Sequence, residues 1–307
     1  MFYRISFFLF LLFNLIGSAP AATAAASEHT AEKELWGKSA ETPKPFANTG
    51  SPSVDESKTV SIRESTPLWL ENAIPEPETQ EDAPMIAIVI DDLGINRKMT
   101  EAVLDLPAPI TTAFLAYAED LPQQTEKARS NGHELLLHVP MEPVNSRLDP
   151  GPDALRTDMT VENIQERFDV MLDSFDGYVG VNNHMGSKFT SDRKAVGTVI
   201  NELKKRELLF LDSMTSGKSL GWKLARDKNI PYVVRDVFLD NARDENEIMK
   251  QLNLVERHAL KHHVAVAIGH PHIATVQALS RWIPKAKEKG FVFVPVSSVA
   301  LIGQDAF

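Results

Sequence analysis

Two adjacent carboxylates, Asp91 and Asp92, come directly after the apolar run that begins at Met85, and Gly94 follows them. An unbroken apolar run of this kind is typical of a strand buried on both faces. In α/β proteins, ligands and catalytic groups lie at the carboxyl ends of such strands. Neighbouring residues at a strand end point in different directions, so one carboxylate can hold a metal ion while the other accepts a proton. The structural alternative is a polar turn into a helix at Asn96, because turns favour Asp and Gly.

Imidazoles and further acidic residues follow other strand-like runs of this chain. Besides the two carboxylates, these polar residues are His138, Glu142, Asn182, Asn183, His184, Asp212, Ser213, Arg235, Asp236, Asp240, His270 and His272. In a β/α barrel the carboxyl ends of all strands converge on one face, so these residues become neighbours. One carboxylate and two imidazoles suffice to hold zinc with a position open for water. A further carboxylate and a further histidine can then serve as base and acid.

Each of these residues also has a structural interpretation. Asp212 can cap the helix that follows it, and Arg235 with Asp236 can form an ion pair at the barrel rim. His270 and His272 are two residues apart on a loop, so their side chains are expected to diverge. The set as a whole indicates a site more strongly than any single member does.

Strand-like runs alternate with amphipathic helical runs after Pro84. The predicted strands are 86–90, 111–115, 134–138, 178–181, 208–211, 232–235, 264–268 and 291–294. The predicted apolar helix faces are 164/168/171/172/175, 196/199/200/203, 248/252/255/259 and 273/276/279/283. This alternation implies a parallel sheet with right-handed crossovers. The predicted fold is therefore α/β, a distorted barrel of seven or eight β/α units.

Composition limits the classes of function. The chain has 307 residues, 43% of them hydrophobic, which is enough for a sizeable core. Its formal net charge of −10 argues against a nucleic-acid partner, because phosphate binding needs clustered Lys and Arg. The sequence contains no cysteine, so any metal must be held by histidines and carboxylates.

The N-terminal part has the pattern of an export signal and a linker. One basic residue, an apolar run and Ala-rich small residues predict a signal peptide at 1–24, and the apolar run is short for a membrane span of about 20 residues. Residues 25–83 are rich in Pro, Glu and Ser and predict a disordered linker, with a small apolar island at Pro67–Leu70. The predicted domain is 84–307. We expect an exported, periplasmic or extracellular protein, tethered to a membrane only if the N-terminal segment stays uncleaved.

The region from about residue 85 to 301 resembles the divergent polysaccharide deacetylase family, a branch of the NodB-like carbohydrate esterases. Five segments carry the resemblance in the same order along the chain: Ile90–Gly94, Leu137–Pro143, Asn182–Ser187, Leu211–Ser213 and Gly269–His272. The resemblance implies a distorted β/α barrel that removes acetyl groups from polysaccharides with one divalent metal, usually zinc. It implies that Asp91 is the general base, Asp92 and His138 are metal ligands, and His270 is the general acid.

The sequence departs from the pattern of the wider family at three places. Glu142 stands where the second metal-binding histidine is expected. The Arg-containing motif is replaced by Asn182–Gly186, and Asp212–Met214 lacks the usual Trp. We expect His184 to supply the missing imidazole, with direct binding by Glu142 as the alternative.

The expected function is therefore metal-dependent removal of acetyl groups from an envelope polysaccharide, with an acetylated or peptidoglycan-type glycan as the partner. Asp212 or Asp236 is expected to orient His270, with Arg235 and His272 as further supporting residues. The alternative is a NodB-like domain with weak or no catalysis that binds a glycan or an envelope partner.

Overall fold

The computed structural model describes residues 66–76, 82–107 and 109–305. All described residues belong to one compact unit within residues 40–307. The predicted signal peptide at 1–24 and most of the predicted linker lie outside the described residues. Within the described part of the chain, every helix is too short or too polar to span a bilayer.

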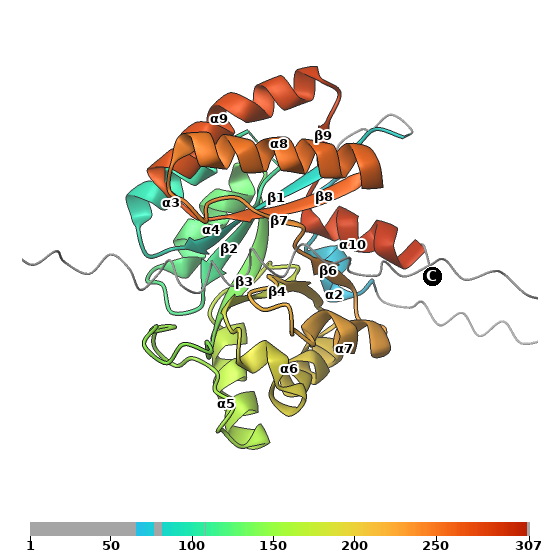
Figure 1. The fold of residues 1–307 in the computed structure, drawn as a ribbon. Coiled ribbons are helices and arrows are strands. Elements are labelled where there is room, and N and C mark those ends of the chain that lie inside the picture. Colours follow the sequence, from blue (N-terminus) through green and yellow to red (C-terminus); the bar gives the residue numbers. More distant parts are fainter. Residues whose placement is uncertain (1–65, 77–81, 108, 306–307) are drawn as a thin grey trace, which may run out of the picture. The chain divides into compact units, whose positions relative to one another are not determined.

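Strands and helices alternate through most of the folded unit (Figure 1). The strands are β1 (Met85–Leu93), β2 (Thr111–Leu115), β3 (Glu134–Met141), β4 (Gly180–Met185), β5 (Leu209–Asp212), β6 (Tyr232–Val234), β7 (Val237–Phe238), β8 (Val264–Gly269) and β9 (Val292–Phe293). The helices are α2 (Leu68–Glu71), α3 (Arg97–Leu104), α4 (Leu121–Ser130), α5 (Val161–Leu172), α6 (Arg193–Arg206), α7 (Gly221–Asp227), α8 (Glu245–His262), α9 (Ile273–Glu288) and α10 (Val296–Asp305), with a short 3₁₀ helix at Phe189–Ser191. Every predicted strand is present, and β7 is the strand that the sequence pattern missed, because two residues show no periodicity.

The strands form one parallel sheet in the order β6-β5-β4-β3-β2-β1-β8-β7, with β9 pairing with β1. β6 and β7 are the two ends of this order, yet only Arg235 and Asp236 separate them in the chain. The backbone amide of Arg235 donates to the backbone carbonyl of Asp212 on β5. The backbone amide of Asp236 donates to the backbone carbonyl of Val266 on β8. A two-residue link can do this only if the sheet curls until its edges approach. The predicted distorted barrel is thus confirmed as a curled, open half-barrel.

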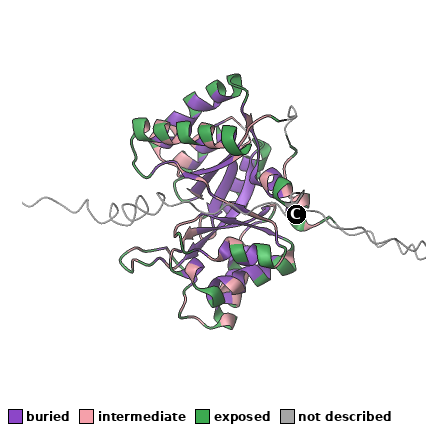
Figure 2. Ribbon diagram, turned by 45° about the vertical axis from the view of Figure 1, so that its right-hand side comes forward, coloured by how far each residue is buried: buried purple, intermediate pink, exposed green. Residues whose placement is uncertain are grey.

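Two apolar layers hold the sheet. Alternate strand residues such as Ala87, Val89 and Leu136 form a cluster inside the curl. The residues between them, such as Ile88 and Leu137, pack outward under the helices. The strands are accordingly buried while the outer helix faces are exposed (Figure 2). Because side chains alternate along a strand, the inward row leads directly to the polar residues at the strand ends.

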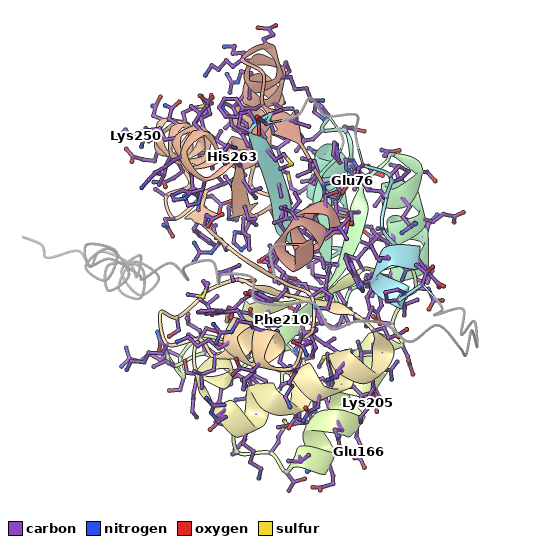
Figure 3. All side chains as sticks on the ribbon, turned by 90° about the vertical axis from the view of Figure 1, so that its right-hand side faces the viewer. Glu76, Glu166, Lys205, Phe210, Lys250 and His263 are labelled. Carbon is purple, nitrogen blue, oxygen red and sulfur yellow. The ribbon has the colours of Figure 1, made fainter. Side chains whose placement is uncertain are left out.

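Most predicted helix faces are buried as expected. The side chains of Ile248, Leu252, Val255 and Ala259 are fully buried on α8. The prediction for Ile273 was wrong, since its side chain is 66% exposed at the first turn of α9. Figure 3 shows the same division elsewhere, with Phe210 inside the fold and Glu166 and Lys205 directed outward.

The amino end of the half-barrel is closed by two helices from opposite ends of the described chain. Trp69 on α2 is 2% exposed and packs in the inner cluster together with Val296 and Ala300 of α10. The Trp69 amide donates a hydrogen bond of 3.0 Å to the Glu207 carbonyl. Residues 66–76 fall within the predicted linker, so the folded unit begins before residue 84. The apolar island is part of the core because Trp69 is buried in the inner cluster.

Trp69→Ala should destabilise the folded unit. Removing a buried aromatic side chain leaves a cavity and costs about 3 kcal/mol or more of unfolding free energy. Urea denaturation of the purified protein measures the loss, and a chain starting at Pro84 should show a similar one. Leu68→Ala is the matched control on the same helix, because Leu68 is 37% exposed. Equal stability of the Trp69 and Leu68 variants would contradict this packing role.

A buried carboxyl lies beside α10. Glu134 Oε1 accepts hydrogen bonds from Thr111 Oγ1 and the Ser297 amide, both at 3.2 Å. Its Oε2 is buried and has no hydrogen-bond partner among the described residues. Burial outweighs these bonds and raises the pKa of Glu134 from 4.5 to about 7. The folded state therefore holds this proton at pH values where the unfolded chain releases it.

Glu134→Gln should make stability less sensitive to pH. The folded-state pKa is raised, so the stability linked to this carboxyl is fully present below pH 4.5 and is lost as the pH rises through about 7. The loss is about 3 kcal/mol at most. The stability of the variant relative to the wild type, measured as the difference between their urea midpoints, should therefore be greater at about pH 8 than at about pH 5. Exposed Glu126 gives the control Glu126→Gln, and a pH-independent difference would refute the assignment.

Candidate metal and acid–base site

The end of β1 directs both of its carboxylates into the mouth of the half-barrel. Asp91 continues the inward row of Ala87 and Val89, and its side chain is buried. Asp92 has a φ of 58°, in the left-handed region, and the register of β1 shifts between Ile90 and Leu93. This local bulge turns the second carboxylate to the same side as the first. Asp tolerates this backbone region better than most residues.

Three residues, Asp92, His138 and His184, each direct one possible metal-ligand atom at the same point. Asp92 Oδ1 lies 3.2 Å from His138 Nε2 and 2.7 Å from His184 Nδ1. The two imidazole nitrogens are 3.2 Å apart. Bonds of about 2.0–2.1 Å to zinc place tetrahedral ligand atoms roughly 3.3 Å from one another. The donor set and its spacing therefore fit one divalent cation, with a position left for a further ligand.

The electrostatic state of this group suits metal binding. Burial acts to raise the pKa of Asp92, but the adjacent nitrogens of His138 and His184 outweigh it and hold that pKa well below its usual range. Asp92 is thus an anion at neutral pH. His138 Nδ1 is 2.8 Å from Asn182 Oδ1, an oxygen that accepts a hydrogen bond. With the proton on Nδ1, the lone pair of His138 Nε2 faces Asp92 and His184.

Asp91 lies beside this group without being part of it. Its Oδ1 accepts a 2.7 Å hydrogen bond from Asn182 Nδ2, and its Oδ2 is 3.8 Å from His138 Nε2. Burial raises the pKa of Asp91, and the neighbouring His138 and His270 reduce the rise. A raised pKa makes a carboxylate a better general base near neutral pH.

His270 faces the group from β8 and is held by Asp240. His270 Nδ1 is 2.9 Å from Asp240 Oδ1, and the His270 amide donates to Asp240 Oδ2 at 2.6 Å. Thr275 Oγ1 also donates to Asp240 Oδ2, at 2.8 Å. Burial acts to lower the pKa of His270, but Asp240 outweighs it and raises that pKa to about 9. His270 Nε2 lies 3.9 Å from Asp92 Oδ2, so a protonated imidazole points at the site.

Glu142 lies apart from the three-residue group. Its Oε2 accepts hydrogen bonds from the Thr157 amide at 2.8 Å and Thr157 Oγ1 at 2.7 Å. Its Oε1 pairs with Lys188 Nζ at 2.8 Å. Both oxygens are engaged in holding the loop after β3, so the alternative of Glu142 as a ligand finds no support in the geometry.

The expectation that Asp212 or Asp236 orients His270 was wrong. Asp212 accepts from Ser219 Oγ at 2.7 Å and from the Met214 and Trp222 amides, so it shapes the loop after β5. Asp236 Oδ2 accepts from the Val266 amide, and its Oδ1 lies 3.3 Å from His258. Both carboxylates are used by their local elements and do not reach the histidine.

Arg235 and His272 contact residues next to the site. The Arg235 guanidinium donates to the carbonyls of Ser213 at 2.6 Å and Met214 at 2.8 Å, and so supports the loop after β5. His272 stacks on His270 with ring centroids 5.9 Å apart, so the two imidazoles do not diverge as expected. Asp240, His270 and His272 form a second group of possible ligands.

Two residues of the site follow predicted strands but were given no role in the sequence analysis. Asn182 contacts both Asp91 and His138, and Asp240 is the partner of His270. Their positions after predicted strands were a signal, but an amide seldom stands out among acids and histidines. Asp240 is separated from its partner by the whole of α8, so spacing gave no means of pairing them.

The sequence matches one protein family and is similar to two curated bacterial proteins. Residues 88–300 match the family described as divergent polysaccharide deacetylase. An uncharacterized protein of Haemophilus influenzae is 33% identical over 204 residues, which are 65% of this chain and 72% of that protein. The uncharacterized protein YibQ of Escherichia coli is 35% identical over 201 residues, 66% of this chain and 63% of its own length, which is less than two thirds.

A solved structure shares the fold. The crystal structure of the uncharacterized protein ATU2773 from Agrobacterium tumefaciens superposes with a TM-score of 0.73 at 29% sequence identity. The superposition covers 76% of this chain and 95% of that one.

The purified protein should bind one divalent cation per chain with high affinity. His184→Ala should abolish this binding, because it removes one of three protein ligands. Glu142→Ala should keep it, since Glu142 is engaged by Thr157 and Lys188. Elemental mass spectrometry after dialysis measures the metal content, and exposed His262 provides the control His262→Ala. Metal retained in the His184 variant and lost in the Glu142 variant would reverse the ligand assignment.

Proposed function

The chain belongs to the divergent polysaccharide deacetylase family, and we propose that it is a metal-dependent hydrolase that removes acetyl groups from an envelope glycan. One observation carries this proposal. The buried carboxylate of Asp91 and the imidazole of His270 flank a three-ligand group formed by Asp92, His138 and His184. A base, an acid and a metal-binding group at one mouth are the parts that hydrolysis of an amide or ester needs.

Asp91 and His270 are placed to act as the base and the acid of this chemistry. Asp91 takes the proton of the attacking water, because its buried carboxylate lies beside the three-ligand group and is held by the Asn182 amide. His270 gives a proton to the leaving amine or alkoxide, because Asp240 keeps its imidazole protonated. A divalent cation, with zinc as the proposed ion, would supply Lewis-acid polarisation of the acetyl carbonyl and a lower pKa for water.

A cavity on the same loops supports a carbohydrate substrate. It has a volume of about 420 Å³ and is lined by loops that follow β3, β4 and β5. Its polar lining includes Ser187, Ser216 and Lys218, and Ser187 is three residues beyond His184. Hydroxyl and ammonium groups are suitable partners for sugar hydroxyls. An export signal at 1–24 and a linker would place such an enzyme next to an envelope polymer, as the sequence pattern suggests.

Asp91→Asn should abolish deacetylation and leave metal binding intact. Loss of a general base costs about 10²–10⁴-fold in kcat, while the three ligand residues are untouched. Acetate release from acetylated glycan oligomers, measured together with metal content, checks both halves. The control is Asp105→Asn at the exposed end of α3. Full activity of the Asp91 variant would exclude this base.

The same assay distinguishes the alternative of a binding domain. If the metal-loaded wild type binds acetylated glycans but releases no acetate, the proposed hydrolase activity is wrong and binding without turnover is the function that remains.

A further inference from the structure

We propose that Asn182 is a positioning residue that couples the metal ligand His138 to the base Asp91 through a single amide. The catalytic half of this inference rests on the proposed function, and the metal-binding half does not. Asn182 is fully buried, and opposite ends of its side chain touch His138 and Asp91.

The amide of Asn182 has a partner for every polar atom. Its Oδ1 lies 2.8 Å from His138 Nδ1. Its Nδ2 donates to Asp91 Oδ1 at 2.7 Å and is 3.3 Å from Ser213 Oγ. An amide nitrogen can only donate, and the 2.7 Å contact of Nδ2 with Asp91 Oδ1 places the nitrogen end of the amide against Asp91. The oxygen end must therefore face His138.

This orientation determines where the proton of His138 lies. An amide oxygen accepts, so His138 Nδ1 must donate and carry the hydrogen. In the neutral ring, Nε2 then has its lone pair directed at the group formed with Asp92 and His184. The opposite tautomer would place an N–H among the ligand atoms and block the site. The Asn182 amide thus fixes the tautomer of His138 and holds the carboxylate of Asp91.

The backbone makes this arrangement rigid. Asn182 is in register with His138 on β3 and with Leu211 on β5, in the middle of the parallel sheet. Its side chain cannot turn away without leaving Asp91 and His138 with unpaired polar atoms in a buried space, which costs free energy. Side chains that hold a ligand in this way change metal affinity and activity when they are removed.

Two variants separate the two ends of the amide. Asn182→Asp keeps an acceptor for His138 but places a second carboxyl against Asp91. Metal affinity should stay within about twofold of the wild type, while kcat falls about tenfold or more with KM unchanged. Asn182→Leu removes both contacts at similar volume. Its metal affinity should fall about 10–100-fold, in addition to the loss of kcat.

Metal-buffered dialysis gives the affinities, and acetate release gives kcat and KM. The control pair is Asn131→Asp and Asn131→Leu, because the Asn131 amide donates to the Leu104 carbonyl away from the site. The inference is overturned if Asn182→Leu binds metal as tightly as the wild type, or if Asn182→Asp keeps the wild-type kcat. If the wild type releases no acetate, the proposed function fails. The metal affinities of the Asn182→Leu and Asn182→Asp variants still test whether Asn182 positions His138 for metal binding. Should the Leu variant not fold, the Asp variant alone decides, because loss of its metal affinity would equally contradict the inference.

Discussion

Parallel strand pairing is the constraint on which the site depends. The register pairs Ile90 of β1 with Gly269 of β8 and His138 of β3 with Asn182 of β4. Because all these strands run in the same direction, their carboxyl ends meet, and the inward row of each strand leads into one mouth. A slip by one residue would turn every inward side chain outward. The apolar layers on both faces of the sheet therefore protect the geometry of the polar groups.

Three carboxylates lie at this mouth, Asp91 and Asp240 buried and Asp92 partly exposed, and each is stabilised by different partners. Asp92 lies against two imidazoles, Asp91 accepts from the amide of Asn182, and Asp240 accepts from a ring nitrogen, an amide and a hydroxyl. The two catalytic candidates thus differ in charge because their partners differ. Burial raises the pKa of Asp91 although the Asn182 amide acts to lower it, whereas the carboxylate of Asp240 keeps His270 protonated.

The closed end of the half-barrel has the opposite character to the mouth. Trp69 and α10 fill the inner space with apolar side chains, apart from the hydrogen-bonded Glu134. This division lets the strand ends carry strained and polar residues, such as Asp92 and Met185 with positive φ, while the core supplies the stability. Function and folding stability therefore depend on different ends of the same strands.

The sequence by itself determined the parallel α/β architecture and the chemical types at the strand ends. Buried parallel strands leave continuous apolar runs, and the polar residues after them are visible without any structure. The pairing of those polar residues was decided by tertiary structure. Asp240 rather than Asp212 or Asp236 reaches His270, Glu142 turns to Lys188, and Asn182 joins Asp91 to His138. Trp69 likewise belongs to the core although its segment is polar and rich in proline. The physical reason is the same in each case: hydrogen bonds and packing act over a few ångströms in space, and the curl of the sheet, which no local pattern encodes, decides which residues come within that distance.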